Sequence, residues 1–418
     1  MLADSKHQLT HLWVTLFRFM QQQPLLIELG LARLELLKRI CLPTLQQQTS
    51  QNFLWIIRAD PDLAEPIKKG LLDILQNATQ ATPEFHVVVV GTNDNPNGFR
   101  RPLPETAEQV WTNNFELLEH FHEASQSRVV LETRLDADDG LHTYFVEVMQ
   151  EEAVQYLDDE DTPNWIVWCA GTHVEWQYGT PWEFPFDAKS SVMLDGTKPK
   201  DAANLTRSSS ASAKTQNTTH HLHQQPKNSS FGSLLPGLTR GCITPGLTKG
   251  YSPEVQFEEL PDAQHHQLHW KLRTCKDDSP DWHQCLVIWN QLVPCAIRGR
   301  TPTSAGMQFV LGSHTSYLSS KAQDLVGLED PDDLYSKQER MWSVVVRYFM
   351  IPKESMAQLR SYLTQHLHAI AEENLLGQCT KGHSCKNSSQ IILKELLGET
   401  MQQQNASIIA DSLPALAT

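Results

Sequence analysis

The sequence predicts an α/β protein built on a mainly parallel β-sheet. Three apolar runs rich in β-branched residues, at 53–57, 86–90 and 129–131, have the length and composition of buried strands. The segments between them repeat apolar residues at helical spacing, so strands and helices alternate along the chain. This alternation is typical of a parallel sheet whose strands are joined by right-handed helical crossovers.

The expected elements follow one another in a simple order. The first strand is expected at 12–19, and a polar turn separates it from a helix at 29–41, which Pro43 should end. Arg33 interrupts the apolar face of that helix and is expected to be solvated. The remaining elements are strands at 53–57, 86–90, 129–131, 165–169, 268–272 and 285–292, and helices at 63–75 and 106–121.

The segment after the fourth strand is strongly acidic. Asp136, Asp138 and Asp139 are followed by Gly140, and beyond it apolar residues return at helical spacing. The carboxylates are therefore expected at a turn from a strand into a helix, at the edge where open α/β sheets bind ligands. Carboxylates this close repel one another unless a cation lies among them, and their hard oxygens suit Mg²⁺ or Mn²⁺. The alternative is a solvated turn in which an aspartate caps the helix.

The composition narrows the range of partners. With 34 Lys and Arg against 49 Asp and Glu, the 418-residue chain has a net charge of −15, which disfavours nucleic acid as a partner. Any phosphate site must then be local, built from a few arginines or a metal ion. No apolar run is long enough for a transmembrane helix, so no transmembrane segment is expected in this chain.

Features of the sequence point to two different compartments. The apolar run at 12–17 is too short for a signal peptide, so the chain is either cytoplasmic or has lost an N-terminal anchor from its gene model. Six Asn-x-Ser/Thr sites and an even number of cysteines, eight, favour the secretory pathway lumen, such as the Golgi. Cys379 and Cys385 are close enough in sequence to pair locally. The six sites are Asn77, Asn204, Asn217, Asn228, Asn387 and Asn405.

The second half of the chain adds a repeat and a basic segment. The repeat, at 236–241 and 245–250, is expected to form two turns, which are either ordinary or open to a ligand at their backbone N–H groups. The segment 297–307 combines Arg298 and Arg300 with glycine and hydroxyl residues. It is expected to be a loop that either holds a diphosphate or is a solvated basic turn.

Four motifs stand in a fixed order along the chain. They are the pair Arg18-Phe19, the run from Leu42 to Trp55, the run from Arg134 to Asp139, and the run from Arg300 to Met307. Together these motifs resemble those of the rhamnosyltransferase-like family of GT-A type glycosyltransferases. The resemblance covers residues 1–190 and 236–350.

The resemblance implies a GT-A-like, Rossmann-type nucleotide-sugar domain with an Asp-x-Asp metal motif. It implies that Asp136, Asp138 and Asp139 hold Mn²⁺ or Mg²⁺, with Asp136 also able to contact the ribose. Other residues would bind the nucleotide sugar and neutralise the charge of its leaving group, and Glu175 or Asp187 would take the proton from the acceptor hydroxyl. The implied nucleotide-sugar residues are Arg18, Asp60, Arg134, Asp136, Arg298 and Arg300.

The same resemblance, together with composition, divides the chain into four parts. Residues 1–190 are expected to form the nucleotide-sugar-binding core, and residues 236–350 the remainder of the catalytic domain on the acceptor side. Residues 191–235 are a polar insertion, rich in Ser, Thr, Asn, Gln and His, which is expected to be disordered. Residues 351–418 are expected to form a helical tail that is partly disordered.

The sequence therefore predicts a metal-dependent glycosyltransferase. It would move a sugar, with rhamnose as one candidate, from a nucleotide-diphosphate donor to a glycan or another hydroxyl acceptor. Three alternatives remain: an inactive nucleotide-sugar-binding or carbohydrate-binding protein of the same fold, a metal-dependent phosphohydrolase using the same aspartates, and a scaffolding protein whose aspartates only cap a helix. The sequence leaves the oligomeric state open.

Overall fold

The computed structural model describes a large part of the chain. The described residues are 10–15, 26–92, 106–125, 127–157, 165–178, 231–238, 242–243, 245–252, 255, 268, 272, 286–289, 292, 294–303 and 334–379. Arg18, Asp187, the greater part of the polar insertion, residues 304–307 and Cys385 lie outside these ranges. The predictions made for them stay predictions.

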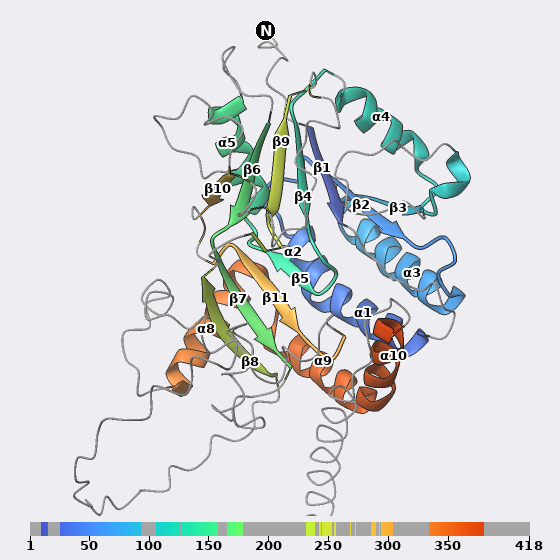
Figure 1. Ribbon diagram of the computed structural model, residues 1–418, viewed down its shortest axis with the longest axis vertical. Coiled ribbons are helices and arrows are strands. Elements are labelled where there is room, and N and C mark those ends of the chain that lie inside the picture. Colours follow the sequence, from blue (N-terminus) through green and yellow to red (C-terminus); the bar gives the residue numbers. More distant parts are fainter. Residues whose placement is uncertain are drawn as a thin grey trace, which may run out of the picture.

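Strands and helices alternate through the first half of the described chain (Figure 1). The strands are β1 (Thr10–Thr15), β2 (Leu54–Ala59), β3 (His86–Gly91), β4 (Val130–Arg134), β5 (Asp139–Leu141), β6 (Trp165–Ala170), β7 (Thr172–Gln177), β8 (Ser233–Leu238), β9 (Leu247–Tyr251), β10 (Leu286–Trp289) and β11 (Ala296–Arg300). The α-helices are α1 (Ile27–Leu36), α2 (Leu42–Gln46), α3 (Glu65–Ala81), α4 (Phe115–Ser125), α5 (Phe145–Leu157), α8 (Leu334–Phe349), α9 (Lys353–Gln365) and α10 (Leu367–Cys379).

Seven of the strands form one large sheet in the order β10-β6-β9-β4-β1-β2-β3. Every neighbouring pair is parallel except the two that involve β9, which runs antiparallel to β4 and to β6. The fold class expected from the sequence, a mainly parallel sheet flanked by helices, is therefore confirmed. Because β1, β2 and β4 run in the same direction, Asp60 and Asp136 follow their strands at the same edge of the sheet.

A second, smaller sheet adjoins that edge, with the order β5-β11-β7-β8 (Figure 1). Strands β11 and β7 are parallel, whereas β5 and β8 pair with them antiparallel. The sheet combines strands that lie far apart in the sequence, since β5 begins at Asp139 and β11 begins at Ala296. It thereby brings the acidic segment beside the basic segment.

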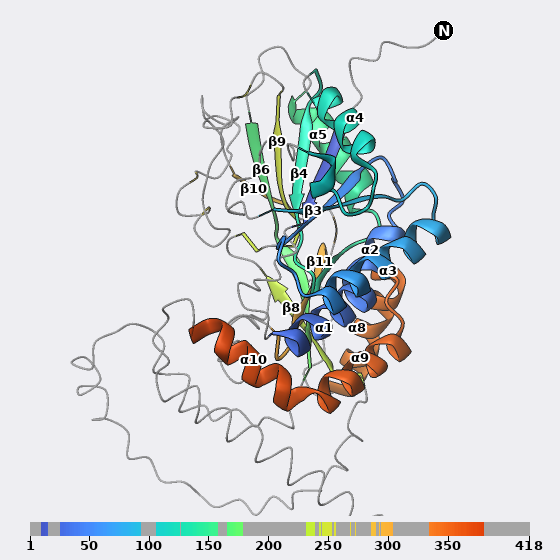
Figure 2. The same cartoon turned by 90° about the vertical axis from the view of Figure 1, so that its right-hand side faces the viewer.

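Two main hydrophobic cores hold these layers together. The first lies under the large sheet and is filled by α2, α3 and α5, with Trp55 and Trp168 fully buried in it. The second lies between one face of the small sheet and helices α1, α8, α9 and α10, with Trp176 and Trp342 buried in it. Figure 2 shows α8, α9 and α10 grouped with α1 below the large sheet.

Pro43 does not end the first helix as the sequence suggested. A π-helical turn at Leu37–Cys41 follows α1, and α2 then continues to Gln46. Pro43 lies in the first turn of α2, where an N–H group has no partner within its own helix. The helical path therefore continues through Pro43 to Gln46.

Several other local predictions also differ from the structure. The expected helix at 106–121 is a 3₁₀ turn at Ala107–Gln109, which a Thr106–Gln109 capping box begins, followed by α4. The two are separate because Val110 pairs with Val90 of β3 in an isolated β-bridge. The described residues of the repeat lie mainly in strands, since 236–238 belong to β8 and 247–250 to β9, with a turn only at 245–246. The backbone conformation of these segments is determined by pairing with strands that are distant in sequence. Local residue propensities carry no information about such partners.

One disulfide is present among the described cysteines, between Cys169 at the end of β6 and Cys242 before β9. Cys41 and Cys295 are buried free thiols. No helix in the described residues is both long enough and apolar enough to span a bilayer.

Candidate functional site

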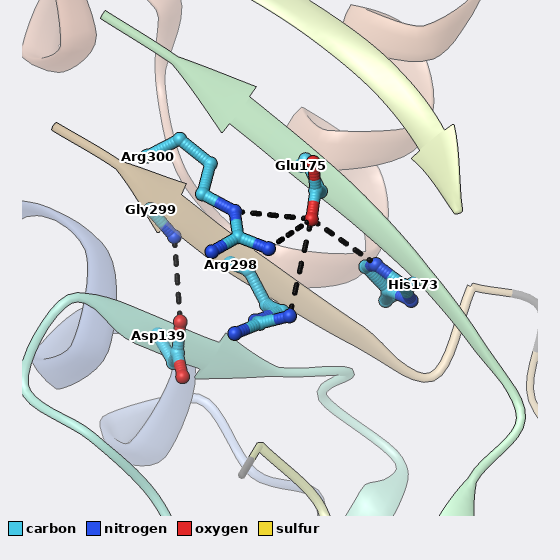
Figure 3. A network of polar contacts seen from close by, with 6 residues as sticks. All are labelled: Asp139, His173, Glu175, Arg298, Gly299 and Arg300. Atoms are coloured by element: carbon cyan, nitrogen blue, oxygen red, sulfur yellow. Dashed lines mark hydrogen bonds and ion pairs between the residues drawn. The ribbon is translucent and has the colours of Figure 1, made fainter. Parts of the chain in front are cut away.

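Three charged residues form a row across three neighbouring strands of the small sheet. Asp139 of β5 is the register partner of Arg298 on β11, and Arg298 is the register partner of Glu175 on β7. Partners that face each other directly across strands share one face of a sheet, so their side chains lie on the same side. Arg300, two residues beyond Arg298, points to that side as well (Figure 3). The opposite face, with Val174, packs into the second core.

Glu175, at one end of this row, is the residue to which the neighbouring basic side chains converge. Its Oε1 accepts hydrogen bonds from Arg300 Nε at 3.1 Å and from Arg300 Nη2 at 2.7 Å. Arg298 Nη1 lies 3.9 Å from the same oxygen, and His173 Nε2 lies 3.6 Å from it (Figure 3). One buried carboxylate oxygen therefore holds two guanidinium groups and a histidine in place.

The electrostatics of Glu175 follow from these contacts. Burial by itself raises the pKa of Glu175, but the His173 hydrogen bond and the charge of Arg300 lower it, and the net pKa lies well below the usual range for glutamate. A carboxylate with such a low pKa is a weak proton acceptor. The geometry therefore favours a positioning role for Glu175, while its role as the catalytic base stays a prediction.

The acidic segment is attached to the basic strand through Gly299. The Gly299 N–H donates to the carbonyl oxygen of Asp138 at 2.9 Å and lies within 3.3 Å of Asp139 Oδ1. The expected turn into a helix is wrong, because β5 begins at Asp139 and α5 begins only at Phe145. Arg298 and Arg300 correspondingly belong to β11 and not to the expected loop.

Burial and the charge of a neighbouring carboxylate raise the pKa values of Asp138 and Asp139. Burial, and then the charge of Asp138, raise the pKa of Asp139 well above the usual range, against the opposing charge of Arg298. Burial, and then the charge of Asp136, raise the pKa of Asp138, against the charge of Arg33. The repulsion inferred from the sequence is thus present, and the arginines only partly offset it.

The carboxylates of the acidic segment can be compared with the ligands that a divalent cation prefers. Within the described ranges, no three His, Cys, Asp or Glu side chains are arranged to hold an ion. Asp139 Oδ1 accepts from the Gly299 N–H, and Asp136 and Asp138 place two further carboxylates in the same short segment. Two carboxylates fit Mg²⁺ or Mn²⁺ when substrate phosphates complete the coordination. The donor set therefore fits a cation that binds together with a phosphorylated ligand.

The run from Leu42 to Trp55 contacts the backbone that follows the acidic segment. Thr44 Oγ1 accepts from the Leu141 N–H at 3.2 Å, and a Cβ at Gly140 would lie 2.8 Å from the Thr44 side chain. Gln48 Nε2 donates to the His142 carbonyl at 3.0 Å, and its Oε1 accepts from the Val146 N–H at 3.0 Å. The motif therefore fixes β5 and the first turn of α5.

Arg33 is a residue of this site that the sequence reading missed. It was expected to be solvated, but its Nη2 donates to the Thr303 carbonyl at 3.3 Å and its side chain is partly buried. Burial lowers the pKa of Arg33, and the charges of Asp138 and Asp136 oppose that shift. The only sequence signal was a charged residue on an apolar helix face. That signal did not indicate which side chains it would face.

The remaining predicted site residues lie apart from the row. Asp60 follows β2, and its Oδ1 accepts from the Asp62 N–H at 3.0 Å in the turn toward α3. Arg134 ends β4 with its Nε buried, and this atom has no hydrogen-bond partner among the described residues. Both residues lie at the carboxyl edge of the large sheet, and neither is among the residues that contact the Glu175 carboxylate within the described part of the chain. Arg18 and Asp187 lie outside the described part of the chain.

Part of the chain matches a known protein family. Residues 31–184 match the family described as "Putative rhamnosyl transferase". No protein with a curated description matches significantly. Among solved structures, the chain is similar to TarS 1–349 of S. aureus in complex with UDP, at 10% identity and a TM-score of 0.24, over 93% of this chain and 91% of that one. At that TM-score the likeness supports no argument about this chain. The family match includes the acidic segment and Glu175, and it confirms over residues 31–184 the rhamnosyltransferase-like family that the sequence motifs indicated.

Proposed function

We propose that this protein is a glycosyltransferase that depends on a divalent cation, Mn²⁺ or Mg²⁺. It would transfer a sugar from a nucleotide-diphosphate donor to a glycan or another hydroxyl acceptor. One observation supports this most strongly: Asp136 and Asp138, at the carboxyl end of β4, adjoin the row formed by Asp139, Arg298 and Glu175. The carboxylates that would hold a cation therefore adjoin the arginines that would bind phosphate.

The residues divide into those that bind charge and those that position them. Asp136 and Asp138 would hold the cation, with Asp139 as a third candidate. When bound, the cation would stabilise the negative charge that develops on the departing diphosphate. Arg298 and Arg300 would face the same phosphates, since guanidinium groups bind phosphate oxygens through paired hydrogen bonds.

Other site residues keep the roles inferred from the family resemblance. Arg18 and Asp60 would bind the nucleoside, and Arg134 would neutralise charge at the carboxyl edge of β4. The proton of the acceptor hydroxyl would pass to Asp187 or Glu175. Since the low pKa of Glu175 weakens it as a base, Asp187 is now the better candidate.

The disulfide bears on the compartment in which the enzyme works. Disulfides persist in oxidising compartments and are rare in the cytosol. The Cys169–Cys242 bond therefore supports the secretory pathway lumen, such as the Golgi, over the cytoplasm.

A second candidate function is a nucleotide-sugar-binding protein without turnover. The low pKa of Glu175 and its hydrogen bonds to Arg300 favour this alternative, because they leave the described part of the site without an identified base. It would keep the cation and diphosphate contacts and lack the proton acceptor.

A donor panel tests both functions. The purified protein is mixed with UDP-, GDP- and dTDP-sugars and Mn²⁺, and the released nucleoside diphosphate is measured. Asp138→Asn removes one negative charge without changing the side-chain shape, and Asp73→Asn, at an exposed position of α3, is the matched control. We expect release from one donor, which Asp138→Asn abolishes and Asp73→Asn preserves.

The other outcomes separate the alternatives. Cation-dependent nucleotide binding without release, even with a panel of hydroxyl acceptors, would favour the inactive binding protein. Phosphate release from p-nitrophenyl phosphate, lost in Asp138→Asn, would favour the phosphohydrolase. Absence of any nucleotide binding would overturn the proposal.

A further inference from the structure

The C-terminal helices α9 and α10 hold the strand ends that follow the charged row. Tyr178 comes directly after β7, and its N–H donates to the Arg300 carbonyl at 3.0 Å. Its hydroxyl lies 2.8 Å from Thr364 Oγ1, and Arg360 Nε donates to its carbonyl at 2.9 Å. Both contacts come from α9. The end of β7 is therefore linked to β11 on one side and to a C-terminal helix on the other.

Helix α10 makes the corresponding contact at the end of β11. Asn374 is 4% exposed, and its Nδ2 donates to the Pro302 carbonyl at 2.7 Å. Pro302 belongs to the turn 301–303, which follows Arg300 directly, and the Thr303 carbonyl of this turn accepts from Arg33. The turn is therefore held from two helices, by an amide of α10 and a guanidinium of α1.

We propose that Asn374 is a positioning residue for Arg298 and Arg300, so that the C-terminal helix completes the charged site. The inference rests on the proposed function, in which these arginines bind a diphosphate. Long arginine side chains act on phosphates only when the backbone that bears them is held precisely, and a displacement of about 1 Å can cost about a hundredfold in activity. The family match ends at residue 184, so it does not include this contribution.

Packing alone does not account for Asn374. Helices α9 and α10 already bury apolar side chains in the second core, among them Leu363 and Ile370. A leucine or methionine would satisfy that core, whereas an asparagine there requires a polar partner. The Pro302 carbonyl is such a partner, and it lies two residues from Arg300.

The test uses the full chain and the variant Asn374→Asp. This change keeps the side-chain shape and replaces the amide donor with an acceptor that repels the Pro302 carbonyl. The matched control is Gln358→Glu on α9, the same amide-to-acid change at a contact with Arg39 that does not touch β11. Hydrogen exchange is measured over residues 294–303 and over β2 and β3, and UDP, GDP and dTDP binding is measured with Mn²⁺.

For Asn374→Asp at neutral pH, we expect faster hydrogen exchange at 294–303 and unchanged exchange at β2 and β3. The affinity for the nucleotide that the unmodified protein binds should fall by about tenfold or more. As the pH falls and the aspartic acid becomes protonated, its hydroxyl can donate to Pro302, so affinity relative to the unmodified protein should recover. Asn374→Ala lacks that group and should not recover. Gln358→Glu should match the unmodified protein throughout.

Two results would overturn the proposal. One is unchanged exchange at 294–303 in Asn374→Asp, and the other is loosened exchange with unchanged nucleotide affinity. If the unmodified protein bound no nucleotide, the proposed function would fail by itself. The exchange data would then still show whether Asn374 holds the end of β11.

Discussion

The backbone N–H of Gly299 donates to the carbonyl oxygen of Asp138 at 2.9 Å, which attaches the acidic segment directly to the strand that bears the two arginines. A Cβ built on Gly299 would lie 2.6 Å from that same oxygen. Only glycine therefore permits this approach. The contact sets the separation of Asp138 and Asp139 from Arg298.

Gly299→Ala should push β5 away from β11, because the atom that its methyl group meets belongs to the backbone and cannot rotate aside. We expect a loss of about 1–3 kcal/mol in the free energy of unfolding, together with much weaker cation-dependent nucleotide binding. Urea unfolding and nucleotide titration measure the two effects. Gly70→Ala is the control, since its Cβ meets only the end of the Leu34 side chain. Equal losses in both variants would contradict the explanation.

Glu175→Gln should destabilise the fold, because it leaves Arg298 and Arg300 without the negative charge between them. Removing one member of a largely buried pair costs about 3–5 kcal/mol, and the partial exposure of both arginines reduces this to about 2–3 kcal/mol. Thermal and urea unfolding at pH 7 measure the loss. An unchanged stability would show that the arginines are compensated from elsewhere.

The low pKa of Glu175 also sets the sign of a pH effect. The pKa of Glu175 is lower in the folded state than in the unfolded state. The contribution of its ionised form to the free energy of unfolding is therefore complete above the unfolded pKa of about 4.3 and is lost as the pH falls through the folded pKa. Stability profiles below pH 5 should therefore fall less steeply for Glu175→Gln than for the unmodified protein. Parallel profiles would place the acid sensitivity in other carboxylates.

His142 should add a second pH-dependent step. Burial lowers its pKa to about 4, and its Nδ1 lies 3.2 Å from the Tyr144 nitrogen, whose N–H it accepts in the neutral form. An unfolded histidine titrates at about 6.5, so the unfolded state binds more protons between pH 6.5 and 4. The contribution of His142 to stability should be fully present above about pH 6.5 and should decrease as the pH falls toward 4. His142→Asn keeps an acceptor without titrating, and its profile over this range should be flatter.

Reduction of the disulfide should lower the melting temperature. The bond closes a loop with a sequence separation of 73 residues between Cys169 and Cys242. Opening a loop of this size costs up to about 4 kcal/mol in the chain-entropy description. Melting with and without dithiothreitol measures the effect. In the double variant Cys169→Ser/Cys242→Ser, dithiothreitol should lower the melting temperature less than in the unmodified protein, and alkylation should reach Cys41 and Cys295 only after unfolding.

Local patterns in the sequence were sufficient for the fold class and for the crowding of the three aspartates. The apolar runs at 53–57, 86–90 and 129–131 coincide with β2, β3 and β4, because buried strands of a parallel sheet are rich in apolar residues. The crowding of Asp136, Asp138 and Asp139 could also be read directly, because electrostatic repulsion between close neighbours does not depend on distant parts of the chain.

The tertiary structure alone decided how that segment meets its partners. Asp139, Glu175 and Arg298 are distant in sequence. The alternation of side chains determines which face of a strand each residue occupies, but not which distant strand becomes its neighbour. The strand β5 has only three residues, too few to show a period. Arg33 and Asn374 join the site through helix packing against a turn. The sequence thus determined the types of charge present, and the folded chain determined which charges lie together.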